Sequence, residues 1–183
     1  MAKILCSPSK YVQGAGELKK LGEYAQKYGE KALVLITESG YKRIGDVVNT
    51  GFEGYEITPV YEYFNRECSK NEINRLVDIM NEKGCDVVIG IGGGKVIDAA
   101  KYMGFLKKLP FISIPTSTSS DGFASSSASL KIEERRVSVP ARLAYGIVVD
   151  TQIIKTAPVK FIYSGIGDMI SKITSIYDWQ YEE

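Results

Sequence analysis

The stretch VVIGIGGGKVIDAAKYM, from Val87 to Met103, is the most informative part of the sequence about architecture: three glycines separate an apolar β-branched run from a run with helical character. In a parallel α/β sheet, a strand that ends in glycines and leads into a helix exposes the free N–H groups of the first helical turn. The missing Cβ atoms let an anion approach that backbone. The stretch therefore predicts a site for an anion such as a diphosphate. A tight turn without a ligand is the alternative, because glycine often only ends an element.

The glycine pattern matches neither of the two common nucleotide motifs. Gly90 and Gly92 begin a GxGxxG motif, but Lys95 stands at its sixth position. A Walker A loop needs Ser or Thr where Val96 stands. The glycines thus indicate an anion without identifying it.

An acidic residue that could hold a ribose lies upstream of the glycines. A standard Rossmann unit has this acid about 20 residues after them, but the next apolar run ends in Thr116 and Ser117. Glu38 follows the run LVLIT, so a dinucleotide would meet the sheet in a different strand order. We hypothesise that Glu38 receives a ribose hydroxyl and disfavours a 2′-phosphate; a solvated loop acid is the alternative.

The rest of the chain alternates between strand and helix patterns. Short apolar runs without clear alternation predict buried parallel strands at Lys31–Thr37, Cys85–Ile91, Pro110–Thr116 and Tyr145–Thr151, with a further strand in 56–64. Helical patterns cover 15–29, 69–84 and 95–108. The strongest begins at Ser69, which forms a predicted capping box with Glu72, and ends at Gly84. The chain is therefore predicted to be α/β, with a Rossmann-like parallel sheet and helices on both faces.

Two segments break this alternation. The segment 130–142, LKIEERRVSVPAR, predicts a β-hairpin excursion that serves as a flap. The segment 164–183 predicts a helix with no stop signal before Glu183. We expect residues 1–163 to form a dinucleotide-binding domain and 164–183 to begin an all-helical C-terminal domain. One face of this helix is apolar and consists of Ile166, Ile170, Ile173 and Tyr177. It would be exposed unless something covers it, which favours self-association.

A loop rich in serine, TSTSSDGFASSSAS from Thr116 to Ser129, follows the strand after the glycine turn. It should lie at the same carboxyl edge of the sheet, where open α/β sheets bind ligands. Its hydroxyls could bond a phosphate or a nicotinamide amide, and Asp121 adds a carboxylate on a sharp turn. A flexible polar loop is the alternative.

Composition excludes several classes of partner. Twenty-three Lys and Arg against 22 Asp and Glu leave a net charge of +1, without a basic stretch suited to nucleic acid. No apolar run approaches the roughly 20 residues of a membrane span, and no signal peptide is evident, so we expect a cytoplasmic protein. Cys6, Cys68 and Cys85 form no CxxC pair and are interpreted as small buried residues. Histidine is absent, which removes the commonest general base and transition-metal ligand.

In order, GGGKVIDAAK, SIPTSTSSDGFASSSASL, VPARLAYGIVVDT and YSGIGDMISKITSIYDW closely resemble the glycerol-1-phosphate dehydrogenases. These belong to a wider group with glycerol dehydrogenase, the iron-containing alcohol dehydrogenases and, more distantly, dehydroquinate synthase. The resemblance implies an active site between the two domains, NAD or NADP as cofactor, one divalent metal (zinc, nickel or iron) and a homo-oligomer. It implies interconversion of sn-glycerol 1-phosphate, a phosphorylated polyol, and dihydroxyacetone phosphate.

The same resemblance implies a role for each matching residue. Gly92 and Gly93 would form the turn, and the pyrophosphate would be wrapped by Gly94, Lys95, Val96, Ile97 and Asp98. The residues in contact with the cofactor toward its nicotinamide end would be Thr116, Ser117, Thr118, Ser119 and Ser125. Asp121 would bind substrate hydroxyls, and Asp168 would bind the metal and lie against the substrate. For Asp168 the alternative is an acid near a helix N-terminus that pairs with Lys172 at i+4.

The chain departs from the family pattern in one respect. The resemblance places two histidine metal ligands beyond Glu183, and this chain has no histidine. We therefore expect it to hold cofactor without a complete metal site, and interpret it as the N-terminal portion of a longer enzyme. Glycerol dehydrogenase, a dehydroquinate synthase-like enzyme and a non-catalytic nucleotide or phosphosugar-binding module stay open. Arg142 is either a phosphate contact or an exposed arginine of the flap.

Overall fold

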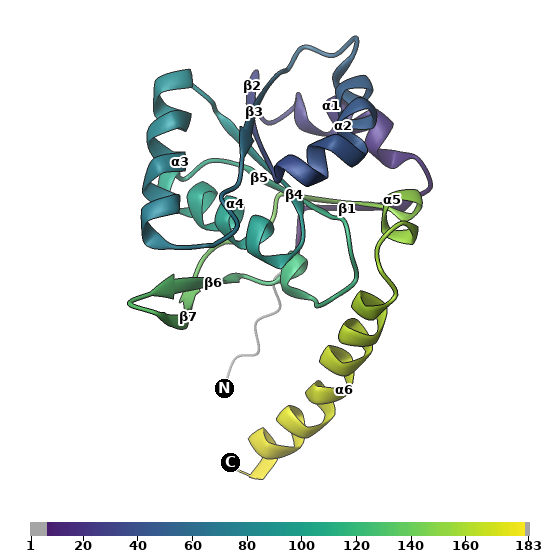
Figure 1. Ribbon diagram of the computed structural model, residues 1–183, viewed down its shortest axis with the longest axis vertical. Coiled ribbons are helices and arrows are strands. Elements are labelled where there is room, and N and C mark those ends of the chain that lie inside the picture. Colours follow the sequence, from purple (N-terminus) through teal and green to yellow (C-terminus); the bar gives the residue numbers. More distant parts are fainter. Residues whose placement is uncertain (1–6, 182–183) are drawn as a thin grey trace.

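The computed structural model describes residues 7–181 and contains a six-stranded parallel sheet flanked by helices (Figure 1). The strands of this sheet are β1 (Lys10–Gly14), β2 (Lys31–Ile36), β3 (Thr58–Tyr63), β4 (Val87–Gly92), β5 (Phe111–Pro115) and β8 (Gly146–Asp150). The helices are η1 (Glu17–Lys20), α1 (Leu21–Ala25), α2 (Glu38–Phe52), α3 (Lys70–Lys83), α4 (Gly94–Lys107), η2 (Gly122–Ala124), α5 (Thr151–Lys155) and α6 (Lys160–Tyr181). The strand order is β1-β8-β5-β4-β2-β3, and every neighbouring pair is parallel, which confirms the predicted sheet.

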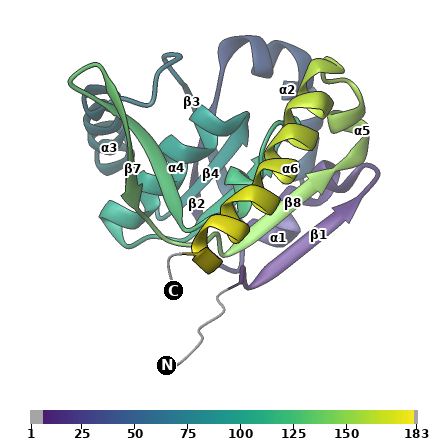
Figure 2. The same cartoon turned by 90° about the horizontal axis from the view of Figure 1, so that it is seen from below.

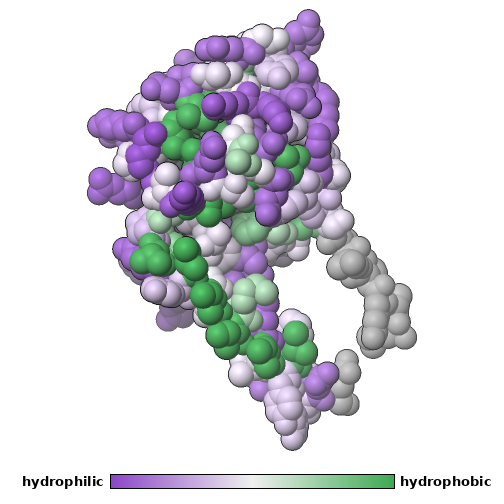
Figure 3. Space-filling view, turned by 90° about the vertical axis from the view of Figure 1, so that its right-hand side faces the viewer, coloured by the Kyte–Doolittle hydropathy of each residue, from purple (hydrophilic) through white to green (hydrophobic). Residues whose placement is uncertain are grey.

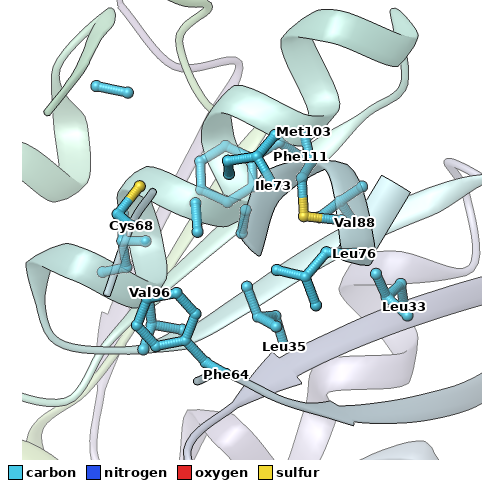
Figure 4. Packing of buried hydrophobic residues seen from close by; sticks show 14 of the residues in the cluster. Leu33, Leu35, Phe64, Cys68, Ile73, Leu76, Val88, Val96, Met103 and Phe111 are labelled. Atoms are coloured by element: carbon cyan, nitrogen blue, oxygen red, sulfur yellow. The ribbon is translucent and has the colours of Figure 1, made fainter. Parts of the chain in front are cut away.

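Both faces of the sheet are buried, which explains the near-continuous apolar runs. Leu33 and Leu35 of β2 pack with Leu76 of α3 and Met103 of α4 on one face (Figure 4). Alternate residues of β2, such as Val34, lie in a second core with α1 and α2 on the other face. Successive side chains of a strand point to opposite faces, so helices on both sides demand apolar residues at every position.

Helix α3 shows its predicted caps, with one correction. The Ser69 hydroxyl accepts a hydrogen bond from the Glu72 N–H at 3.3 Å, and Gly84 ends the helix at φ 65°. The Glu72 carboxylate does not return to the Ser69 N–H; it accepts from the Asn65 N–H at 2.9 Å and bonds the Arg75 guanidinium. The reciprocal half of the predicted capping box was therefore wrong. The helix predicted over 15–29 is also only partly correct, because this segment divides into the 3-10 helix η1 and the short helix α1.

Helix α2 and strand β1 were not predicted. The Thr37 hydroxyl caps α2 by accepting from the Gly40 N–H at 3.0 Å, so Glu38 lies in a first helical turn and not in a loop. Strand β1 lies at the sheet edge beside β8 (Figure 2). Packing against the sheet fixes α2, and pairing with β8 fixes β1.

The predicted hairpin is present as β6 (Ser127–Ile132) and β7 (Arg135–Pro140). Its two turn residues, Glu133 and Glu134, have φ values of 47° and 64°, which suits the twist of a two-residue hairpin. Ala128 and Leu130 of β6 are buried in the core shared with α3 and α4. One strand of the hairpin is thus anchored on the domain.

Helix α6 projects from the body of the domain (Figure 1). It begins at Lys160, so the expected boundary after Tyr163 falls within its first turns, and none of its residues is buried. The predicted apolar face is exposed by 51% at Ile166 and 71% at Ile173, and Figure 3 shows apolar residues along this helix. Among helices in the described range, none is both long and apolar enough to cross a membrane.

Two of the three cysteines are described. Cys68 and Cys85 are buried and free, as predicted. Burial raises the pKa of the Cys68 thiol to about 12. Cys6 lies outside the described residues.

Candidate functional site

The glycine turn between β4 and α4 presents open backbone donors. The Gly93 carbonyl accepts from the N–H groups of Val96 and Ile97 at 3.1 and 3.2 Å. The N–H groups of Gly94 and Lys95 find no partner within residues 7–181. A Cβ atom at Gly93 or Gly94 would have no neighbour within 4 Å. These donors and the helix dipole therefore fit an incoming diphosphate.

The remaining residues assigned to the pyrophosphate face other groups. Val96 and Ile97 are buried in the core, so only their backbone is near the turn. Lys95 Nζ lies 2.8 Å from a carboxylate oxygen of Glu67. The Asp98 carboxylate accepts from the Ser129 N–H at 3.2 Å, on the hairpin. The structure thus places Gly92 to Lys95 at the turn and directs the Asp98 side chain elsewhere.

The carboxyl ends of β2, β4 and β5 lie side by side, because these strands are neighbours in the sheet. A cavity of about 180 Å³ opens there, lined in part by Thr37, Gly93, Thr116 and Ser117. Arg43 of α2 also lines it. Sequence reasoning missed Arg43 because it missed the helix that carries it.

Glu38 lies at the end of β2, one strand from the glycine turn. Its carboxylate is exposed and lies 2.7 Å from Lys42 Nζ. The hydrogen bond from Lys42 lowers the pKa of the Glu38 carboxyl, so it is ionised at neutral pH. Glu38 lines a polar hollow at the end of β2 together with Lys42, Arg66 and Arg75. Arg75 is itself paired with the carboxylates of Glu62 and Glu72.

The serine loop contacts α6. The Ser164 hydroxyl donates to the Ser119 carbonyl at 3.1 Å. Gly165 lies against Thr118, where a Cβ atom would overlap the Thr118 carbonyl oxygen. These contacts place the start of α6 beside the loop.

The loop and α6 bring Asp121 and Asp168 together. A carboxylate oxygen of Asp168 accepts from the Asp121 N–H at 3.0 Å. Lys172 Nζ lies 2.9 Å from Asp121 Oδ2 and 3.6 Å from Asp168 Oδ2, so the i+4 pair anticipated as the alternative is also present. The hydrogen bond to Asp121 raises the pKa of Lys172.

These carboxylates do not by themselves form a metal site. Within the described range, no three His, Cys, Asp or Glu residues are grouped so that they could hold an ion. The single positive charge of Lys172 offsets one of the two negative charges of Asp121 and Asp168. Asp121 and Asp168 would therefore need further ligands to hold a metal ion.

A cavity of about 480 Å³ lies between the serine loop and α6. Its walls are largely apolar, with Phe123, Ile166 and Met169, and Asp121 and Asp168 supply its charged groups. Arg142 is exposed and does not line this cavity, which fits its interpretation as a flap arginine.

Lys101 of α4 is a charged residue that sequence reasoning missed. Its side chain is fully buried, and its Nζ lies 2.7 Å from the carbonyl oxygens of Gly122 and Ser127 and 3.0 Å from Ser125 Oγ. Burial lowers the pKa of Lys101, and the nearby Asp98 opposes that shift. Three oxygens match the three donors of an ammonium, so we assign the charged form. Ser125, expected at the cofactor, is directed toward Lys101.

A six-stranded parallel sheet with helices on both faces defines a Rossmann-like α/β fold, in which ligands bind at the carboxyl edge of the sheet. Residues 12–158 match the sequence profile of the iron-containing alcohol dehydrogenases, and the chain belongs to this family.

Individual relatives agree with this assignment. A glycerol dehydrogenase of Citrobacter freundii is 39% identical over 176 residues, covering 93% of this chain and 48% of the relative. A glycerol-1-phosphate dehydrogenase of Metallosphaera sedula is 37% identical, covering 97% of this chain and 50% of the relative. The crystal structure of glycerol dehydrogenase from Schizosaccharomyces pombe superposes with a TM-score of 0.85 at 32% identity, covering 93% of this chain and 44% of that one. The chain spans about half the length of the curated relatives it matches.

Proposed function

We propose that this chain is the dinucleotide-binding part of an NAD(P)-dependent dehydrogenase that interconverts sn-glycerol 1-phosphate and dihydroxyacetone phosphate. The observation that carries the proposal is the pair of open N–H groups at Gly94 and Lys95 beside the hydroxyls of the serine loop. The nucleotide and the substrate are those that the names of similar proteins print.

In this proposal the cofactor lies across the carboxyl ends of three strands. Its pyrophosphate meets the N–H groups of Gly94 and Lys95, and its adenosine ribose meets Glu38 at the end of β2. Its nicotinamide end meets hydroxyls of the loop that begins at Thr116. The bound nicotinamide would supply the hydride chemistry, while the protein binds and orients it.

The substrate is proposed to occupy the cavity between the serine loop and α6. Asp121 and Asp168, which line this cavity, are proposed to receive its hydroxyl groups. Asp168 is proposed as one ligand of a divalent metal whose other ligands are not among the described residues. Residues 164–183 are proposed to belong to a helical substrate domain, because the exposed apolar face of α6 requires a covering surface.

Glycerol dehydrogenase is the second candidate, favoured by the charge of the cavity. Phosphate esters are commonly bound by Arg or Lys. None of the described residues that line this cavity is Arg or Lys, and Lys172, which contacts two of them, is already paired with Asp121 and Asp168. An uncharged polyol needs no further cation.

Two measurements test the proposal. Titration with NADH, followed by nicotinamide fluorescence, should give saturable binding to this chain. NADH oxidation with zinc, nickel or iron should then be compared on dihydroxyacetone phosphate and dihydroxyacetone. A higher rate on the phosphorylated ketone supports the first candidate, and a higher rate on the free ketone supports the second. The comparison of the two ketones needs the chain extended by the proposed helical domain, because the described residues hold no complete metal site. NADH binding by that extended chain without turnover on either ketone supports a non-catalytic nucleotide-binding module.

A further inference from the structure

The buried ammonium of Lys101 joins helix α4 to the far end of the serine loop. Lys101 is 1% exposed. Its acceptors at 2.7 Å are the carbonyl oxygens of Gly122 and Ser127, which stand 21 and 26 residues later in the chain. The loop thus turns its own backbone toward a side chain that belongs to the helix.

A stabilising role in the core does not explain this arrangement. A buried charge costs desolvation free energy, and apolar residues of similar volume often stabilise a core as well or better. Here the charge is fully satisfied: Ser125 Oγ lies 3.0 Å and Asp98 Oδ1 3.4 Å from Nζ. The Asp98 carboxylate also accepts from the Ser129 N–H, which extends the network to β6. Such a network favours one defined arrangement of the loop.

The two ends of the loop are held by the same structural unit. At its start, the Thr116 N–H donates to the Gly92 carbonyl at 3.0 Å. At its end, Lys101 holds Gly122 and Ser127. Helix α4 begins at Gly94, so Lys101 lies about two turns from the open N–H groups on the same rigid element. The distance between the glycine turn and the loop is therefore set through α4.

We propose that Lys101 is a positioning residue that fixes the serine loop relative to the glycine turn, so that one dinucleotide spans both. This inference rests on the function proposed above. Lys101 does not contact the cofactor; it acts through the backbone of residues 122–127. The adenosine and pyrophosphate part should therefore bind without it, whereas the nicotinamide part should not.

The test compares NADH with ADP-ribose, which lacks the nicotinamide, on the Lys101→Met variant. Fluorescence and calorimetric titrations should show NADH binding weakened about tenfold, with ADP-ribose binding changed by no more than about twofold. Lys107→Met, on the exposed last turn of α4, is the matched control and should bind both probes like the original chain. Equal losses for the two probes, or no loss for either, would overturn the proposal.

A second measurement separates this inference from the proposed function. Hydrogen exchange should show loss of protection in 120–128 of Lys101→Met, while amides of β4 and β5 stay protected. Unchanged protection of the loop overturns the positioning role whether or not the chain binds NADH. An original chain that binds neither probe refutes the proposed function, and loop exchange then tests the positioning alone. If circular dichroism shows Lys101→Met unfolded, Lys101→Gln, which keeps two donors, replaces it throughout.

Discussion

Gly165 of α6 lies against Thr118 of the serine loop so closely that a Cβ atom at position 165 would overlap the Thr118 carbonyl oxygen. The neighbouring Ser164 hydroxyl donates to the Ser119 carbonyl at 3.1 Å. This contact brings Asp168, one helical turn later, to the Asp121 N–H. Close packing against the loop therefore explains why the first residue of the GIGDM segment, Gly165, is a glycine.

Gly165→Ala should separate α6 from the serine loop, because the Thr118 carbonyl is backbone and cannot yield easily. Hydrogen exchange should show faster exchange at the Asp121 amide, which loses its Asp168 acceptor. Gly167→Ala is the matched control: its Cβ atom would meet nothing within 4 Å. That variant should keep the protection and gain about 0.5 to 1 kcal/mol of helix propensity. Equal protection in both variants would contradict the packing role.

Glu38→Ala should shift the nucleotide preference toward NADPH. The lowered pKa keeps the Glu38 carboxyl ionised at neutral pH, where it repels a 2′-phosphate. Removing it also frees Lys42. The ratio of the NADPH and NADH dissociation constants, from fluorescence titration, should fall about tenfold. Glu30→Ala, on the opposite edge of the sheet before β2, should leave the ratio unchanged, and an unchanged ratio in both variants argues against Glu38 at the ribose.

Glu72→Gln should lower stability near neutral pH and much less in acid. Burial by itself raises the pKa of Glu72, but hydrogen bonds from Arg75 and the Asn65 N–H outweigh it and lower the pKa. The ionised group therefore contributes stability above the ordinary glutamate pKa of about 4.3, and the contribution is lost as the pH falls through the lowered value. Urea unfolding at pH 7 should show a loss of about 1 to 2 kcal/mol.

The same unfolding measurements should show the difference shrinking as the pH approaches 3, where both chains carry a neutral group. Glu53→Gln is the control, because Glu53 is an exposed residue at the C-terminal end of α2. A loss at Glu72 that is independent of pH would mean that shape, and not charge, sets its contribution.

The parallel sheet, and the position of the glycine turn and the serine loop at one edge of it, could be predicted because local sequence patterns determine them. Strands buried on both faces need apolar residues throughout, and parallel strands share one carboxyl edge. The glycine turn after β4 and Thr116 after β5 were therefore placed correctly at that edge.

The missed parts depend on contacts between distant segments. Gly40, Gly45 and Gly51 obscure the pattern of α2, although Ile44 and Val48 pack on the sheet and define the helix. Strand β1 is short and half exposed, and it exists by pairing with β8, 136 residues later. The burial of Lys101 depends on carbonyls of a loop whose path no local pattern reveals.

The most direct test of the central claim is NADH binding by the Gly93→Asp variant. A Cβ atom at position 93 would meet no atom within 4 Å, and Asp is favoured at a helix N-cap, so the variant should fold normally by circular dichroism. Its carboxylate would cover the open N–H groups and repel a pyrophosphate. Gly93→Asn is the uncharged match and should weaken binding less. We predict saturable NADH fluorescence for the original chain and none for Gly93→Asp; equal binding by both, or no binding by the folded original chain, would contradict a dinucleotide site at this turn.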